Sequence, residues 1–241
     1  NKFQNIRITW FGGEPLMAYD KIVLFNSLLK LPKSVSYGAG IITNGYYLTK
    51  EVIENLNNLR ITTIQITLDG MKETHNKRKF CSETKDTFSV VINNIDIFSK
   101  IHKEIKLKIR VNLDEKNKHE YIKLEKYLKE RYKNCQNISI VPAFLLDISP
   151  NERKSSCNFD RNGKAKFYKY LSQETNNAQY LYPSNSFGEC AIRNKNAIAI
   201  APDGGVYKCW EIIGDEKYKY GELTDKGIKI TDKTILNRYL Y

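Results

Sequence analysis

The stretch WFGGEPL at residues 10–16 decides how the rest of the chain is interpreted. An alternating apolar run, Ile6 to Phe11, leads into it and predicts a strand. The paired glycines predict a tight turn that a ligand can approach closely, because no Cβ covers the backbone. Pro15 suits the first turn of the helix that follows. Glu14 is therefore expected at the carboxyl end of a strand, where α/β folds bind ligands, although a solvated turn is the simpler alternative.

Strand-like and helical patterns alternate through residues 1–147. Further strand-like runs lie at 35–42, 61–68, 105–113 and 138–146. Helical patterns lie between them, at 22–29, 49–59, 87–101 and 119–132. Pro32 is expected to end the first helix, and Pro142 to interrupt the last strand. The alternation predicts an α/β fold, a parallel sheet with covering helices that is either open or closed into a barrel.

Three of the predicted strands end in turns that combine glycine with polar residues. These turns are residues 12–14, Thr43-Asn44-Gly45 and Thr67-Leu68-Asp69-Gly70. Polar residues that gather at the carboxyl ends of successive parallel strands indicate a ligand-binding rim. Ordinary turn chemistry explains any one of the three, but it explains all three together less well.

The composition changes after residue 148. Residues 149–186 are rich in Asn, Lys, Ser and Tyr, and they hold one amphipathic helix near 164–171. Residues 197–209 then predict a β-hairpin with Cys190 and Cys209 towards its outer ends. Two such cysteines are either half of an iron–sulfur or zinc ligand set or small buried core residues. We therefore expect three parts: a barrel at 1–147, a covering helix and linker at 148–187, and a second unit at 188–241.

Composition excludes several classes of protein. The net charge of +12 comes largely from lysines interleaved with acidic residues in predicted helices, which argues against a nucleic-acid surface. Such a charge could still steer an acidic peptide or a nucleotide. No apolar run approaches the length of a membrane span, so no membrane partner is expected. The odd number of cysteines, five, favours a reducing cytoplasm over a disulfide scaffold.

Taken together, the motifs resemble the radical S-adenosylmethionine (SAM) enzymes that carry a SPASM-type C-terminal extension. Residues 12–15 are similar to the GGEP motif of that superfamily, and residues 43–45 to its TNG turn. Residues 66–70, with His75 and Arg78, resemble its S-[IL]-DG…H-x-x-R segment. Cys190, Gly204 and Cys209 match the opening of the SPASM motif in spacing. The resemblance extends over residues 6–209.

The resemblance implies a partial (β/α)6 barrel that begins here at its second strand, followed by the start of a SPASM-type β-hairpin extension. Thr67 would stand where relatives have a serine that contacts SAM, and Arg78 would pair with the SAM carboxylate. His75 is expected to order its loop and Asp69 to shape its turn. The residues expected to bind SAM are Gly12, Gly13, Glu14, Thr43, Asn44, Thr67, Arg78, Asn112 and Val141, the last two from their positions alone.

The iron–sulfur ligands implied by the resemblance are incomplete in this sequence. The C-x3-C-x2-C motif of the radical [4Fe–4S] cluster is absent and is expected upstream of Asn1, and later SPASM cysteines are expected beyond Tyr241. The sequence is therefore interpreted as an internal fragment. One or two auxiliary [4Fe–4S] clusters are expected, and Cys190 and Cys209 would supply some of the ligands of one of them. Cys81, Cys135 and Cys157 have no motif partner and are interpreted as structural, which completes the five cysteines.

The function implied is reductive cleavage of SAM and abstraction of hydrogen from a precursor peptide or a protein, with an electron donor such as flavodoxin or ferredoxin. Relatives that oxidise sulfatases place an Asp directly after the second SPASM cysteine. Trp210 stands there in this chain, which disfavours that reaction, and Glu211 and Asp203 are candidate bases for another. The alternatives are a radical SAM enzyme for a small metabolite or sugar, and a cluster-free module that binds a nucleotide or peptide.

Overall fold

The computed structural model describes residues 4–145, 160–182, 192 and 194–239. By its internal contacts the chain divides into two compact units, Asn1–Leu181 and Tyr182–Tyr241. The helix expected near 164–171 is present as α6 (Arg161–Thr175) and belongs to the first unit. Within the described residues, no helix combines the length and the apolar character that crossing a membrane requires.

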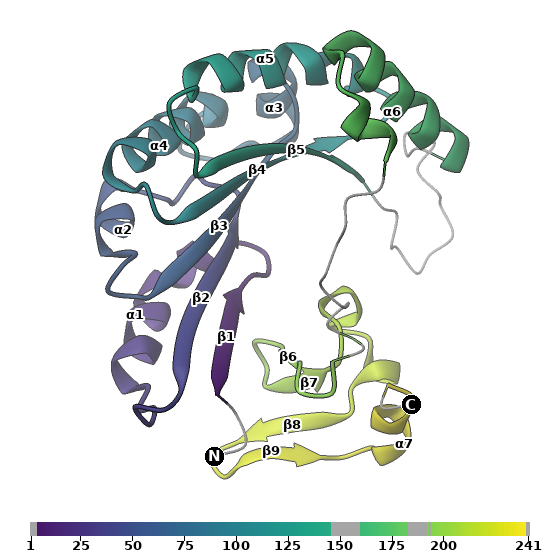
Figure 1. Cartoon of the computed structure of the whole chain (residues 1–241). Helices are drawn as coiled ribbons and strands as arrows, with labels where there is room; N and C mark the ends of the chain where they lie inside the picture. Colours follow the sequence, from purple (N-terminus) through teal and green to yellow (C-terminus); the bar gives the residue numbers. More distant parts are fainter. Residues whose placement is uncertain (1–3, 146–159, 183–191, 193, 240–241) are drawn as a thin grey trace. The chain divides into compact units, whose positions relative to one another are not determined.

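The first unit is built on five parallel strands in the order β1-β2-β3-β4-β5, with each strand paired to the next along the chain. The strands are β1 (Asn5–Trp10), β2 (Ser36–Thr43), β3 (Ile61–Leu68), β4 (Lys106–Leu113) and β5 (Ile138–Phe144). Figure 1 shows the sheet curving with helices along its outer face. The α/β fold with a partial barrel that the sequence predicts is thus confirmed.

Helices follow the strands along the chain and cover the outer face of the sheet (Figure 1). They are η1 (Pro15–Ala18), α1 (Tyr19–Leu28), α2 (Lys50–Asn55), α3 (Lys72–Arg78), α4 (Thr87–Ile101), η2 (Lys118–Glu120), α5 (Tyr121–Arg131), α6 and η3 (Ala178–Leu181). The sequence predicted each long helix of this set but not α3. Thr49 begins α2 as expected, because its hydroxyl accepts the N–H of Val52 at 3.4 Å.

The two faces of the sheet differ in polarity. In β4, Leu107, Ile109 and Val111 are buried against the helices, whereas Lys106 and Lys108, which alternate with them, are exposed. Successive strand residues point to opposite faces, so the same strand supplies both the core and the inner surface of the partial barrel. The helices therefore bury one face of the sheet and leave the inner face available for ligands.

One expectation about β5 is wrong. The strand was expected to be interrupted at Pro142, but pairing with β4 continues through Pro142, which lies opposite Val111. β5 is the last strand of the sheet, and an edge strand tolerates a residue that has no N–H. The strand therefore runs unbroken from Ile138 to Phe144.

The second unit contains a four-stranded antiparallel sheet in the order β6-β7-β8-β9. The predicted hairpin is present, because β6 (Ala199–Ile200) pairs antiparallel with β7 (Gly205–Tyr207). The sequence did not predict the rest of this unit. It consists of η5 (Trp210–Ile212), η6 (Glu216–Tyr218), β8 (Gly221–Thr224), β9 (Gly227–Ile230) and α7 (Lys233–Asn237).

Candidate functional site

The Glu14 carboxylate joins the turns that follow β1 and β2. One of its oxygens, Oε1, accepts the hydroxyl of Thr43 at 2.6 Å and the N–H of Leu16 at 3.1 Å. The other, Oε2, accepts the N–H of Asn44 at 2.7 Å. Two turns about thirty residues apart in sequence are therefore held together by one half-buried charged side chain. Glu14, Thr43 and Asn44 form a single structural unit at the carboxyl edge of the sheet.

The two glycines before Glu14 leave their backbone open at this edge. Both are exposed, and apart from each glycine and its two chain neighbours no atom of the described residues lies within 4 Å of the place where either Cβ would be. Gly12 has φ +138°, a conformation that other residues rarely adopt. An anionic or zwitterionic ligand could approach these N–H groups closely.

Buried residues of β3 and α4 hold the turn after β2 in position. Gly45 has φ +82°, and a Cβ at this position would lie 2.9 Å from the Cγ2 atom of Ile66. Buried Asn94 of α4 donates its amide to the carbonyl oxygen of Gly45 at 2.9 Å and to that of Tyr46 at 3.1 Å. The contacts of Gly45 with β3 and α4 therefore set the position of the neighbouring Asn44 at the carboxyl edge of the sheet.

The contacts of Gly45 lead to a prediction about stability. We expect Gly45→Ala to lower the free energy of unfolding by about 2 kcal/mol, because it adds a clash to an unfavourable φ. Gly13→Ala is the matched control and should change that free energy by less than about 0.5 kcal/mol, since its Cβ meets open space. Urea unfolding followed by tryptophan fluorescence gives both values. Equal effects of the two substitutions would contradict this description of the turn.

The turn after β3 is held by a buried histidine. The Nδ1 atom of His75 accepts the N–H of Asp69 at 3.2 Å, so the ring proton must lie on Nε2. His75 is 1% exposed. Burial lowers the pKa of His75 from 6.5 to about 4, and His75 is therefore neutral near pH 7. The expectation that His75 orders its loop agrees with this geometry.

The lowered pKa of His75 predicts how stability depends on pH. The unfolded chain takes up a proton near pH 6.5 and the folded chain only near pH 4, so the contribution of His75 is complete above pH 6.5 and is lost as the pH falls towards 4. The loss amounts to about 3 kcal/mol. His75→Gln should flatten the dependence of unfolding free energy on pH in this window. His119 is exposed, and His119→Gln should leave the pH dependence of the unfolding free energy unchanged. Identical slopes of unfolding free energy against pH in wild type, His75→Gln and His119→Gln would refute the assignment of this dependence to His75.

A buried amide joins the ends of β3 and β4. Asn117 is fully buried, and its Nδ2 atom donates to the carbonyl oxygens of Asp69 at 2.8 Å and Asn112 at 2.9 Å. Its Oδ1 atom accepts the N–H of Asp114 at 2.8 Å. The side chain of Asn112 in turn donates to a carboxylate oxygen of Asp69 at 2.9 Å. Asp69 and Asn112, both singled out from the sequence, thus lie together at the rim.

The side chain of Arg78, at the end of α3, reaches the same network. Its Nη2 atom lies 2.9 Å from both carboxylate oxygens of Asp114. Burial acts to raise the pKa of Asp114, but the hydrogen bonds from Arg78 and from the N–H groups of Asn117 and Lys116 outweigh it, so the pKa lies below its ordinary value. The sequence did not identify Asp114 or Asn117. A short polar turn directly after a strand was the available signal.

The remaining expected SAM residues lie on the inner face of the sheet. Thr67 of β3 is opposite Arg110 of β4, and Arg110 is opposite Val141 of β5. The three side chains therefore form one row across three strands, close to the carboxyl edge. Thr67 and Val141 are half-buried.

The hairpin residues belong to the second unit. Asp203 accepts the N–H of Gly205 at 2.9 Å and so shapes the hairpin turn, and Glu211 accepts the indole N–H of Trp210 at 2.9 Å. Cys209 is a half-buried free thiol. Cys190, its expected partner, lies outside the described residues, as does Cys157. Among the residues described, no group of three or more His, Cys, Asp or Glu side chains could hold a metal ion.

A buried lysine supports the hairpin next to Cys209. Lys208 is 1% exposed, and its ammonium donates to the carbonyl oxygens of Asn194 at 2.6 Å and Ala197 at 2.7 Å. Burial lowers the pKa of Lys208. Its side chain ties the segment before β6 to the end of β7.

Comparisons with solved structures find folds similar to this one. "Native anSMEcpe with bound AdoMet" matches with a TM-score of 0.69 and 21% identity, over 97% of this chain and 66% of that one. A histidine-tagged anSMEcpe with bound AdoMet matches with a TM-score of 0.67 and 22% identity, over 91% of this chain and 61% of that one. "Native anSMEcpe with bound AdoMet and Kp18Cys peptide" matches with a TM-score of 0.66 and 21% identity, over 97% of this chain and 67% of that one. The chain thus spans about three fifths to two thirds of these proteins, and at this identity the likeness concerns the fold.

A comparison with curated proteins finds no match. A family model described as "Radical SAM superfamily" matches residues 2–131, more than half of the chain. The matched region contains the turns after β1, β2, β3 and β4, which carry the residues described above. The chain belongs to the radical SAM superfamily.

Proposed function

We propose that this chain is the SAM-binding part of a radical SAM enzyme of the SPASM branch that modifies a peptide or protein. The observation that carries the proposal is a pair of hydrogen-bond networks at the carboxyl edge of the sheet. Glu14 joins the turns of β1 and β2, and Asn117 joins those of β3 and β4. Ligands of α/β folds bind at this edge.

The residues at this edge suit the amino-acid end of SAM, which carries one carboxylate and one ammonium group. The open backbone at Gly12 and Gly13 offers N–H donors, and the Nε and Nη1 atoms of Arg78 face no partner among the described residues. Thr67 and Asn112 add a hydroxyl and an amide. We assign Thr43 and Asn44 to the same site through their bonds to Glu14, and Val141 to an apolar contact with the adenine.

The iron–sulfur groups are a proposal drawn from the family. When bound, the radical [4Fe–4S] cluster supplies the electron that cleaves SAM. The described residues do not fit this cluster, because no cysteine precedes Cys81 and no C-x3-C-x2-C motif occurs in the 241 residues. Its ligands would come from outside them. Cys209 and Cys190 would contribute to an auxiliary cluster in a SPASM-type unit, for which the β6–β7 hairpin next to Cys209 is the supporting feature.

The peptide substrate and the remaining partners are likewise proposed. Two solved structures of similar fold contain both AdoMet and a peptide, which supports a peptide or protein substrate here. We propose a flavodoxin or ferredoxin as electron donor and the cytoplasm as location. We also propose the three parts expected from the sequence, with boundaries after residues 147 and 187. Glu211 and Asp203 stay candidate bases. Their hydrogen bonds to Trp210 and Gly205 support structural roles as well.

Binding of SAM to the 241-residue chain tests the proposal. Ligand-observed NMR measures dissociation constants into the millimolar range, with ATP as the control for a general nucleotide site. We expect saturable binding of SAM that ATP does not displace. Equal binding of SAM and ATP would instead support a nucleotide-binding module. No binding of SAM by a folded chain would count against the assignment of the rim.

A further inference from the structure

The inner face of β4 carries three cations in succession. Lys106, Lys108 and Arg110 alternate with the buried residues Leu107, Ile109 and Val111, so all three point away from the helices. Within the described part of the chain, none of the three forms an ion pair. By contrast, Arg78 and Arg131, on the helices, are paired with Asp114 and Asp96.

Arg110 is the most constrained of the three. Its Nε atom is buried and has no hydrogen-bond partner among the described residues. It lies between Thr67 and Val141 in the register of the sheet, and its neighbours therefore supply a hydroxyl and an apolar group but no charge. A buried guanidinium N–H without a partner is costly, and an anionic ligand would satisfy it.

The five strands themselves contribute no acidic side chain and no inward aromatic side chain to this face. None of the five strands contains Asp or Glu, and Arg7 adds a fourth cation on β1, where it donates to the Thr63 hydroxyl at 3.0 Å. The aromatic residues Trp10, Tyr37 and Phe144 of these strands pack against the core. The inner face is thus positively charged and otherwise made of small, polar or aliphatic side chains.

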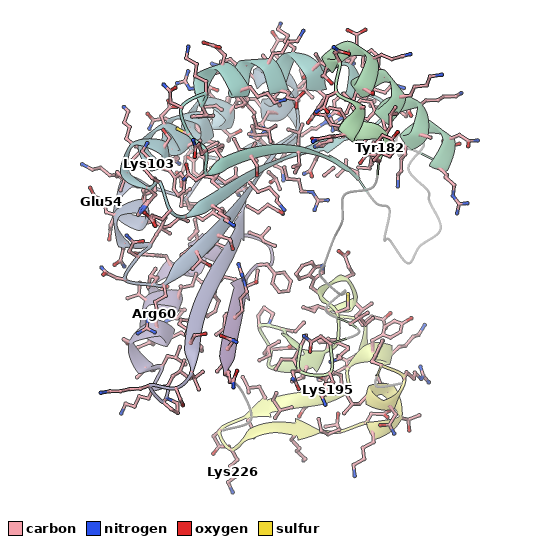
Figure 2. All side chains as sticks on the ribbon, viewed as in Figure 1. Glu54, Arg60, Lys103, Tyr182, Lys195 and Lys226 are labelled. Carbon is pink, nitrogen blue, oxygen red and sulfur yellow. The ribbon has the colours of Figure 1, made fainter. Side chains whose placement is uncertain are left out.

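A pocket continues this face at the amino-terminal end of β4. It has a volume of about 300 Å³ and is lined by Lys103, Glu104, Lys106, Gln136, Asn137 and Ser139. Figure 2 labels Lys103 in the connection that leads into β4. Lys106 of β4 and Ser139 of β5 belong to both the pocket and the inner face. The basic row therefore runs from the SAM-binding edge to an open cavity.

We propose that the inner face of β4 binds a substrate peptide in extended conformation through acidic side chains of the peptide. Alternate residues of an extended chain lie about 6.6 Å apart, which is also the spacing of the three cations along β4. A peptide with Asp or Glu at every second position can therefore place one carboxylate against each cation. This inference rests on the proposed function and specifies the substrate class.

A nucleic acid fits this face less well. Proteins that bind single strands combine cations with aromatic side chains on which bases stack, and the aromatic residues of these strands pack against the core instead. Carboxylates need only the cations, because Arg and Lys donors match them directly.

The test compares charge-matched variants of the 241-residue chain in binding an octapeptide of alternating Glu and Ser. Lys106→Gln/Lys108→Gln should weaken binding about four- to twentyfold, and Arg110→Gln about tenfold or more. Lys123→Gln/Lys126→Gln removes the same charge from exposed positions on α5 and should weaken binding less than twofold. The dissociation constant of SAM is measured for each protein, and Lys106→Gln/Lys108→Gln is expected to leave it unchanged, because neither lysine is paired in register with Thr67 or Val141.

Each other outcome overturns the inference. Equal binding of the matching Gln and Ser octapeptide would show that carboxylates are not recognised. Equal weakening by the α5 variant would show non-specific attraction, and tighter binding of a mixed-sequence oligonucleotide would favour nucleic acid. Loss of SAM affinity in Arg110→Gln would place Arg110 in the SAM site instead. A chain that binds SAM but not the acidic octapeptide refutes only this inference, whereas a chain that does not bind SAM refutes the proposed function.

Discussion

Glu14→Gln is expected to lower the rate of 5′-deoxyadenosine formation at subsaturating SAM by about ten- to a hundredfold. The rate is measured on the longest reading frame that contains this chain, reconstituted with iron and sulfide and reduced under anaerobic conditions. The substitution keeps the size of the side chain and changes only its donors and acceptors. Its effect therefore reports on the hydrogen bonds of Glu14 rather than on packing.

The size of this effect follows from the contacts of the carboxylate. Oε1 and Oε2 both accept hydrogen bonds from the β2 turn, one from Thr43 and one from Asn44. An amide has only one acceptor oxygen, so its NH2 group must face a donor N–H group, either that of Leu16 or that of Asn44, and at least one of those two bonds is lost. The turn that carries Gly12 and Gly13 would then lose its fixed position beside Asn44.

Glu54→Gln is the matched control for Glu14→Gln. Glu54 lies exposed on α2 (Figure 2), and its carboxylate is 3.6 Å from the ammonium of Lys50. The Glu54→Gln substitution should leave the rate of 5′-deoxyadenosine formation unchanged. A Glu14→Gln enzyme that is folded and as fast as wild type would show that the bond between the two turns has no role in SAM binding.

Arg78→Ala is expected to lower the same rate about a hundredfold or more, because it removes the guanidinium assigned to the SAM carboxylate. It should also lower the free energy of unfolding by about 2 kcal/mol, because Asp114, whose side chain is 9% exposed, loses its cation. Stability alone therefore does not explain the expected loss of rate, and a second variant separates the two effects.

Asp114→Asn supplies that separation. It removes the charge that holds Arg78 and should destabilise the protein about as much as Arg78→Ala does, yet the guanidinium remains available to SAM. We expect its rate to fall no more than about fivefold. Equal losses of rate in Arg78→Ala and Asp114→Asn would mean that Arg78 acts only through the stability of the rim.

Much of the first unit could be predicted because its elements have clear periodicity. β3 and α4 begin and end where the sequence pattern placed them, at Ile61–Leu68 and Thr87–Ile101. Each presents apolar residues at the spacing of its own secondary structure. The motif turns could be identified because glycine and polar residues mark them directly.

Other elements carried no such signal. α3 has one buried residue, His75, and depends on contacts from elsewhere, such as Glu120 accepting the N–H of Met71 at 2.7 Å. In β9 every residue is exposed, so alternation of burial is absent. The roles of Asn117 and Arg110 depend on contacts between strands that are far apart in sequence. Only the folded chain brings these groups together.

The central claim is that this chain binds SAM for reductive cleavage, and the most direct test is 5′-deoxyadenosine formation by the longest reading frame after anaerobic reconstitution and reduction. We predict product well above the enzyme-free control. A folded protein that binds iron and SAM but forms no 5′-deoxyadenosine would contradict the claim.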